Sequence, residues 1–143
     1  MSLDLAAHDA VHDALVDSAQ TALQALIGQR VYDRVPANKL PAYPYVVIDR
    51  IEVRDDANVC SYASEVHVTL RVISNAAGSV EAKTIGGLIR PILAPEDPEE
   101  NLAIDGFVVS VSAFDLAIYR PADDPLLTEG VLTFTYLVDP EEE

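Results

Sequence analysis

Apolar residues recur every three or four positions over two stretches of the chain, and this spacing predicts two helical regions. The first region extends from Leu3 to Ile27 and ends at Gly28, a residue type that commonly follows a helix. Its apolar side consists of Val11, Leu15, Ala22, Leu23 and Leu26. Asp17 and Ser18 favour caps and turns over helix interiors, so the pattern leaves open whether this region is one helix or two.

The second helical region follows Ser79, whose hydroxyl is a good N-cap. It contains Gly86 and Gly87, which each cost about 1 kcal/mol relative to alanine in a helix. We expect both glycines to mark a close approach of the helix to a sheet. Pro91 is expected to bring the helix toward its end, because an interior proline removes a helical hydrogen bond.

Alternation of apolar and polar residues predicts about five strands. The clearest strand alternates between residues 65 and 73, and it should pair antiparallel with the strand before it. The predicted strands are Arg30–Val35, Tyr45–Arg54, Glu65–Ile73, Phe107–Tyr119 and Thr128–Val138. The order of helix, strands, helix and strands predicts an α+β fold: a mostly antiparallel sheet with two helices packed on one face. We expect residues 1–143 to form a single domain.

Polar segments separate the predicted strands. Asp55 to Ala63 and Arg120 to Leu127 are too long for tight turns and should form protruding hairpin loops. Ala94 to Glu100 is a connection rich in proline and acid. The acidic tail from residue 139 to residue 143 is expected to be disordered.

The balance of charge limits the partners of this chain. Its 143 residues include 24 acidic residues against nine Lys and Arg, which gives a net charge of −15. Such a molecule repels nucleic acid and anionic membranes, which argues against sequence-specific DNA binding. The same charge would let DNA pass along its surface without adhering, although it equally fits a plain acidic protein. The sequence has neither a signal-peptide pattern nor a run of about 18 apolar residues, so we expect synthesis in the cytosol.

Candidate catalytic residues are few. His8 and His12 are spaced as in a zinc-binding H-E-x-x-H helix, but aspartate replaces the glutamate. The third histidine, His67, lies on a predicted strand, and no nucleophile-elbow pattern accompanies any of the three. Gly86 and Gly87 lack the spacing and the lysine of a phosphate loop, and the single Cys60 cannot form an internal disulfide or a cysteine metal cluster. We therefore predict no catalytic residue, metal or cofactor.

One long segment carries a family resemblance. After Gly28 the chain reads Arg30-Val31-Tyr32-Asp33, then a proline-rich loop, then Tyr43-Pro44-Tyr45-Val46-Val47-Ile48. The strand Val66 to Val72, the helix Glu81 to Leu93 and the closing Gly130 to Phe134 follow in the same order. This arrangement resembles the tail-completion or tail-terminator proteins of long-tailed phages and gene transfer agents.

The resemblance implies a structural protein and not an enzyme. It implies a hexameric ring that caps the finished tail tube, ends tube polymerisation and forms part of the head–tail joint. The implied partners are other copies of the chain, the tail tube protein and a head-side connector or stopper protein, while DNA passes through the lumen. Such a protein is assembled in the bacterial cytoplasm and then belongs to the phage or gene-transfer-agent particle.

The two hairpin loops are the expected interface regions, since exposed loops on a sheet can become ordered when a partner docks. The residues expected at the interfaces are Asp55, Asp56, Asn58, Tyr62, Arg120, Asp123, Asp124 and Leu126. The alternative is that both loops are solvated hairpin ends. Two other functions also remain open: another neck component, such as a head–tail adaptor or stopper, and a small α+β ligand-binding or metal-dependent enzyme domain.

Overall fold

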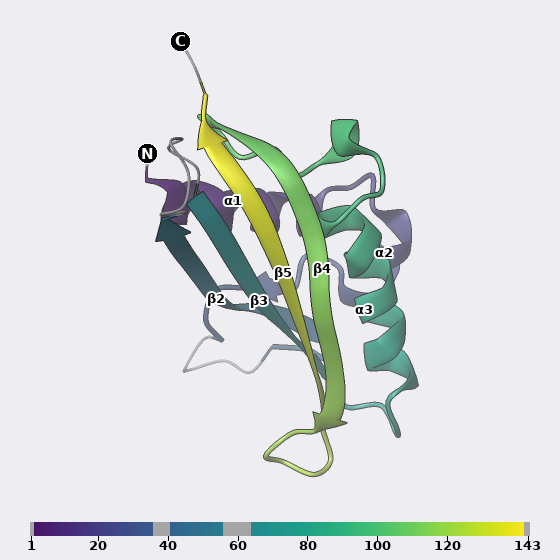
Figure 1. Cartoon of the computed structure of the whole chain (residues 1–143). Coiled ribbons are helices and arrows are strands. Elements are labelled where there is room, and N and C mark those ends of the chain that lie inside the picture. Colours follow the sequence, from purple (N-terminus) through teal and green to yellow (C-terminus); the bar gives the residue numbers. More distant parts are fainter. Residues whose placement is uncertain (1, 36–40, 56–63, 142–143) are drawn as a thin grey trace.

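The structure, a computed structural model, describes residues 2–35, 41–55 and 64–141. Figure 1 shows a long twisted sheet with the helices behind it. The sheet has five strands: β1 (Val31–Tyr32), β2 (Tyr45–Asp55), β3 (Ser64–Ser74), β4 (Phe107–Pro121) and β5 (Thr128–Pro140). Their order in the sheet is β1-β2-β3-β5-β4, in which β1 is parallel to β2 and every other neighbouring pair is antiparallel. The predicted fold class, α+β with a mostly antiparallel five-stranded sheet, is confirmed.

The first helical region is two helices, α1 (Leu3–Val16) and α2 (Thr21–Ile27). Asp17 separates them, and its carboxylate accepts a hydrogen bond from the amide of Ala19 at 2.9 Å. This interruption resets the helical phase, so that Ala22, which was expected on the buried side, is exposed. α2 ends at Gly28, whose φ of 57° is a conformation that favours glycine. With α3 described below, three helices cover the sheet where two were predicted.

The first strand is shorter than predicted. β1 contains only Val31–Tyr32, because its parallel pairing with β2 extends over just Val46 and Val47. Arg30, which was expected to begin the strand, instead donates hydrogen bonds from its guanidinium to the carbonyls of Leu26 and Pro44. Its side chain thereby ties the end of α2 to the start of β2.

The two central strands follow the prediction closely. β2 (Tyr45–Asp55) and β3 (Ser64–Ser74) are antiparallel, as expected, and each is extended slightly beyond its predicted bounds. β3 buries alternate residues, whereas a register irregularity between Ile48 and Arg50 places Asp49 outside the regular pairing of β2. Asp55 is thus the last residue of β2 and not the first residue of a loop.

The last two strands form a long hairpin. β4 (Phe107–Pro121) and β5 (Thr128–Pro140) pair over most of their length, with register shifts in β4 at Val109/Val111 and Phe114/Leu116. Arg120 belongs to β4, which is a correction to the predicted loop. Residues 139 and 140, assigned from the sequence to a disordered tail, pair with β4 in the sheet. The acid-rich connection before β4 contains a short 3-10 helix, η1 (Pro98–Glu100).

The helix α3 (Val80–Leu93) corrects two details of the prediction. Ser79 occupies the N-cap position, but its side chain makes no capping hydrogen bond. Pro91 lies near the end of the helix, as expected, and the helix ends at Leu93. Only Gly86 lies close to the sheet: a Cβ there would be 2.0 Å from the hydroxyl oxygen of Tyr119, whereas a Cβ on Gly87 would meet nothing within 4 Å.

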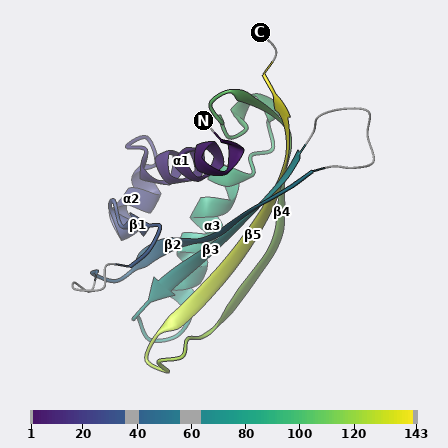
Figure 2. The same cartoon turned by 90° about the vertical axis from the view of Figure 1, so that its left-hand side faces the viewer.

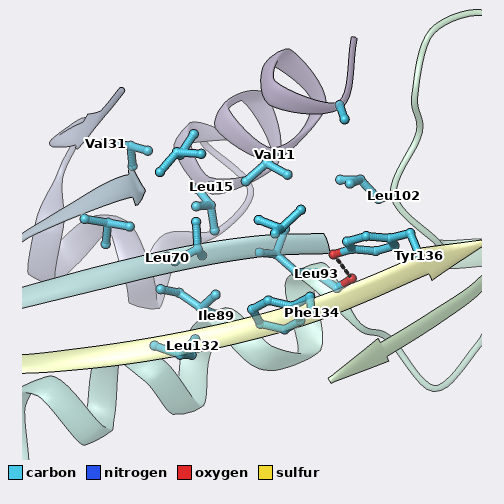
Figure 3. Packing of buried hydrophobic residues seen from close by; sticks show 14 of the residues in the cluster. Val11, Leu15, Val31, Leu70, Ile89, Leu93, Leu102, Leu132, Phe134 and Tyr136 are labelled. Atoms are coloured by element: carbon cyan, nitrogen blue, oxygen red, sulfur yellow. Dashed lines mark hydrogen bonds between the residues drawn. The ribbon is translucent and has the colours of Figure 1, made fainter. Parts of the chain in front are cut away.

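One face of the sheet carries the core. Figure 2 shows the three helices on that face, and the other face, which we call the open face, carries no helix. Figure 3 shows apolar side chains of α1, α3, β3 and β5 meeting between the layers. Tyr136 lies among them and donates a hydrogen bond from its hydroxyl to the carbonyl of Leu93 at 2.6 Å. Burial raises the pKa of Tyr136 far above its usual value.

Candidate assembly surfaces

The strand ends that flank the two predicted interface loops lie at opposite ends of the sheet. Asp55 pairs with Ser64, and Ser64 pairs with Val138, so β2 ends and β3 begins at the end of the sheet where β5 finishes. The connection between β4 and β5 lies at the other end, where Pro121 pairs with Thr128. β3 extends between the two ends over 11 residues, which corresponds to about 33 Å. Two partners could therefore contact the two loops of one subunit without meeting.

The β2–β3 connection is largely outside the described residues, and three of its predicted interface residues, Asp56, Asn58 and Tyr62, fall there. Cys60 falls there as well. Only Asp55 is placed, at the end of β2. The predicted role of this loop in an interface stays a prediction.

The connection between β4 and β5 is held closed by its own hydrogen bonds. The amide of Ala122 donates to the carbonyl of Leu127, and the carboxylate of Asp124 accepts from the amide of Leu126 at 3.0 Å. Asp123 is exposed, and 80% of Leu126 is accessible to solvent. This loop presents one large apolar side chain and acidic groups on a defined backbone.

Arg120 differs from the other predicted interface residues near this loop, because it lies on β4 and forms an ion pair. Its guanidinium lies 3.7 Å from the carboxylate of Glu129, which is directly opposite on β5. More than half of the Arg120 side chain is nevertheless exposed. An exposed ion pair of this kind contributes little to stability, so Arg120 remains able to contact another molecule.

A groove beside this loop was not found from the sequence. It has a volume of about 620 Å³ and lies between the loop, the turn before α3 and Tyr43. The hydroxyl of Thr128 donates to the carbonyl of Gly78 at 3.1 Å and so joins the loop to the turn. The groove combines segments far apart in the chain, and the turn sequence Asn75-Ala-Ala-Gly78 gives no indication that it lies beside the loop.

A second surface missed from the sequence is the outer strand β4. Its open face carries four half-exposed aliphatic side chains, whereas the exposed and partly exposed residues on the other long strands are mostly polar. The four residues are Val108, Val111, Leu116 and Ile118, with exposed fractions of 52%, 46%, 51% and 42%. The indication in the sequence was the nearly uninterrupted apolar composition of this strand, which lacks the alternation of an amphipathic strand.

On the same open face, the part that lies farthest from β4, on β2 and β3, carries charged side chains. The carboxylate of Glu52 accepts from Arg54 at 2.6 Å and lies 3.3 Å from Arg50. The hydrogen bond from Arg54 is the main reason that the pKa of Glu52 is lowered. Arg71 on β3 pairs with Asp49 at 3.0 Å. The face thus changes from charged on β2 to apolar on β4.

The two histidines of α1 lie beside acidic side chains. His8 lies 3.6 Å from the carboxylates of both Asp9 and Asp33, and His12 lies 3.6 Å from Asp13. Within residues 2–35, 41–55 and 64–141, no group of three or more histidine, cysteine or acidic side chains is arranged to hold a metal ion. The zinc-like spacing of His8 and His12 thus accompanies pairing of each histidine with acidic neighbours.

His67 takes part in a polar cluster that superficially resembles a catalytic triad. Its Nδ1 lies 3.1 Å from the hydroxyl of Thr135, and that hydroxyl donates its proton to Asp115. In a triad the histidine lies between the nucleophile and the acid and accepts the proton of the nucleophile. Here the hydroxyl lies between the other two groups, so this order does not activate Thr135. The cluster joins β3, β5 and β4 across the open face.

Comparison with known proteins identifies the family. Residues 9–139 match the family described as Tail completion protein gp17. This chain belongs to that tail completion family. The family is one of structural virion proteins and not of enzymes, in agreement with the prediction. Comparison with curated proteins finds no match.

The tail completion protein also resembles a chain of a solved particle. That structure is described as the virion of a native gene transfer agent particle. The two chains are 26% identical, the match covers 90% of each, and the TM-score is 0.74. No helix in the described parts of the tail completion protein is long and apolar enough to cross a membrane.

Proposed function

We propose that this protein forms a hexameric ring that caps the tail tube, ends the addition of tube subunits and forms part of the head–tail joint. The observation that carries the proposal is the tail completion family match over residues 9–139, together with the similarity to a gene-transfer-agent virion chain across 90% of both chains. The proposal places the protein in the bacterial cytoplasm during assembly and in the tail or neck of a particle afterwards.

The arrangement of exposed surfaces supports a ring. A closed ring is a heterologous assembly, so each subunit needs two different lateral surfaces that fit each other, in addition to any surface for the tube. An open sheet has two different edges, and here they are separated by the width of the sheet. The two ends of the sheet at which the strands are connected by loops, here called the loop ends, are separated along the strand direction. They remain free for partners that lie along the axis of the ring.

The two loop ends are assigned to the two axial partners. One end carries the β4–β5 loop with Asp123, Asp124 and Leu126, next to Arg120. The other end carries the segment that follows Asp55, with Asp56, Asn58 and Tyr62. One end contacts the terminal ring of the tube, and the other contacts the head-side connector or stopper.

The net charge of −15 supports a passage for DNA that does not bind it. The purified ring should show no retention of double-stranded DNA at low ionic strength, where electrostatic attraction would be strongest. Retention of DNA that salt abolishes would contradict an acidic lumen, although it would leave capping itself possible.

The ring is tested by native mass spectrometry over a range of concentrations and by negative-stain imaging, where six subunits around a central hole are expected. Capping is tested separately by adding the protein to polymerising tube subunits and measuring tube length. Capping predicts that growth stops and that rings are found at tube ends. Binding to portal or connector protein without binding to tubes would instead identify a head–tail adaptor or stopper.

A further inference from the structure

The outer strand β4 has a composition that its position does not explain. Ten of the 13 residues from Phe107 to Tyr119 are apolar. Such a strand is typical of a sheet position covered on both faces. Yet none of the 15 residues of β4 is buried, and among the described residues the strand pairs on one side only, with β5.

Both flanks of this edge are open. On the open face, the exposed side chains of β4 continue onto β5, since Val111 lies opposite Leu137 and Ile118 lies opposite Val131. On the helix side, a groove of about 360 Å³ lies between α3 and β4. Arg90 lies over the ring of Phe114 in this groove, 3.9 Å from the ring centre. A long, apolar, unpaired edge of this kind is a template for pairing with another strand.

The opposite edge of the sheet is also largely unpaired. β1 pairs with β2 only through Val46 and Val47, so that the following segment, residues 49–54, has no strand on its outer side in the described parts of the chain. This segment carries Arg50 and Arg54, whose side chains are 66% and 60% exposed. A single glutamate, Glu52, lies between them.

We propose that β4 of one copy pairs, edge to edge, with residues 49–54 of β2 in a second copy of this chain. The inference rests on the ring proposed above and names the contact between its subunits. Repeated around a closed circle, the contact joins the sheets of successive copies into one continuous sheet. The occupant of the apolar edge is thus another copy of the same chain.

The direction of the strands favours this contact. β4 is antiparallel to β5, β5 to β3, and β3 to β2, so β4 and β2 run in opposite directions. Rotation about an axis along the strands preserves their direction in the next copy. The pair formed between copies is therefore antiparallel, which is the slightly more stable kind of ladder.

Charge also favours a second copy as the occupant. Two chains that each carry −15 repel one another, so a contact between them is favoured where neither surface is acidic. β4 carries one exposed acid, Asp115, and one exposed base, Arg120, so this edge has no net charge. Residues 49–54 of β2 carry Arg50 and Arg54 against Asp49 and Glu52, so this segment has no net charge either. The two edges can therefore meet without the repulsion that acts between the rest of the two chains, and each offers charged groups of both signs.

The irregularities of β4 limit the length of the contact. Bulges blunt free edges and discourage unlimited pairing. The shifts at Val109/Val111 and Phe114/Leu116 leave one regular run of six residues, Leu116 to Pro121. On the other edge, β1 covers the start of β2. A contact confined to short segments fits a closed ring better than an open fibre.

The first test compares the association of purified full-length variants by native mass spectrometry and sedimentation over a range of concentrations. Leu116→Lys places a charge in the apolar edge and should weaken association by at least about tenfold, equivalent to about 1.4 kcal/mol. Val80→Lys is the matched control, because Val80 is 75% exposed at the start of α3 and should leave association unchanged. Circular dichroism and urea midpoints verify that both variants fold.

The second test exchanges the charges. Asp115→Arg should weaken association, and so should Arg54→Glu, whereas the double variant should recover at least part of the loss. Asp13→Arg makes the same change of charge at an exposed position of α1 and should have no effect on association. Hydrogen exchange of the wild-type chain should show protection of β4 amides in the assembly relative to the monomer.

Each outcome separates the contact from the proposed function. The wild-type chain can form rings while Leu116→Lys and Asp115→Arg associate as strongly as the wild type. It can also form rings in which the β4 amides are not protected from exchange. Either result overturns the pairing of β4 with β2 and leaves capping intact. A wild-type chain that is monomeric at every concentration, even beside tube ends, also overturns it. If the β4 variants lose binding to the tube while their self-association is unchanged, the β4 edge is a contact with the tube protein, and the pairing between copies is wrong. Open fibres that depend on both edges would support the pairing but contradict the ring.

Discussion

β5 and β4 are neighbours in one hairpin, yet their environments differ. β5 alternates strictly between buried and half-buried residues from Gly130 to Val138, whereas β4 buries none of its residues. Both sequences have a high preference for extended structure. The difference comes from the strand order, which places β5 between two strands and leaves β4 at the edge. Local composition predicts that a strand forms, while burial depends on which strands flank it.

The largest effect is expected when one side chain on each strand is truncated and the losses in the free energy of unfolding are compared. Phe134 on β5 is fully buried, so Phe134→Ala should lower the free energy of unfolding by about 3–5 kcal/mol. Leu116→Ala on β4 should lower it by less than about 1 kcal/mol in the monomer, because half of that side chain is already exposed. Urea denaturation measures both. Equal losses would mean that β4 is covered within the monomer.

A tyrosine on each strand sharpens the comparison. The hydroxyl of Tyr136 on β5 donates to the buried carbonyl of Leu93, so Tyr136→Phe should cost about 1–3 kcal/mol by leaving that carbonyl unpaired. Tyr119 on β4 has no such bond among the described contacts, and Tyr119→Phe should cost less. Urea unfolding at neutral pH compares the two variants. A greater loss of unfolding free energy for Tyr119→Phe would contradict the expectation that the hydroxyl of Tyr136 contributes more.

The same tyrosines predict a dependence on pH. Burial raises the pKa of Tyr136 strongly, and it also raises the pKa of Tyr119, where Arg90 acts in the opposite direction. Their contribution to stability is present below the unfolded pKa of about 10 and is lost as the pH rises toward the folded values. In a spectrophotometric titration Tyr119 should ionise before Tyr136. Tyr136→Phe should reduce the alkaline loss of stability more than Tyr119→Phe does.

The smallest expected effect concerns the way α3 approaches β4. A side chain at Gly86 would displace the ring of Tyr119, which is also held against Gly130 on β5. Gly86→Ala should cost about 0–2 kcal/mol, because crowding of about 1–3 kcal/mol exceeds the helix propensity gained. Gly87→Ala meets open space and should instead stabilise by up to about 1 kcal/mol. Thermal unfolding distinguishes them, and equal midpoints would refute the close contact at Gly86.

Elements with a strong periodic pattern were predictable from the sequence. β3 and β5 were placed to within a residue or two because each buries one face, and α3 was found from its apolar stripe. The break at Asp17 was recognised but could not be decided, since capping residues allow either one helix or two. The short β1 was predicted too long, because its pairing with β2 stops after Tyr32, a limit that no local pattern reveals.

The candidate surfaces were less predictable than the fold. The hairpin loops could be located along the chain because strand ends are clear in the sequence, but which strand ends share one end of the sheet depends on how the strands pair. The same holds for the apolar edge: Leu116 and Ile118 read as core residues until β4 is placed at the border. The two glycines of α3 looked equivalent, and only the position of Tyr119 separates them.

The direction of the long strands has a mechanical consequence. β3, β4 and β5 all extend between the two loop ends, so tension applied between partners at those ends acts along the strands. The hydrogen bonds of an antiparallel ladder are perpendicular to the strands. Such tension loads many of these bonds in shear at the same time instead of opening them one after another. The sheet is therefore oriented to resist stretching along the line that joins its two ends.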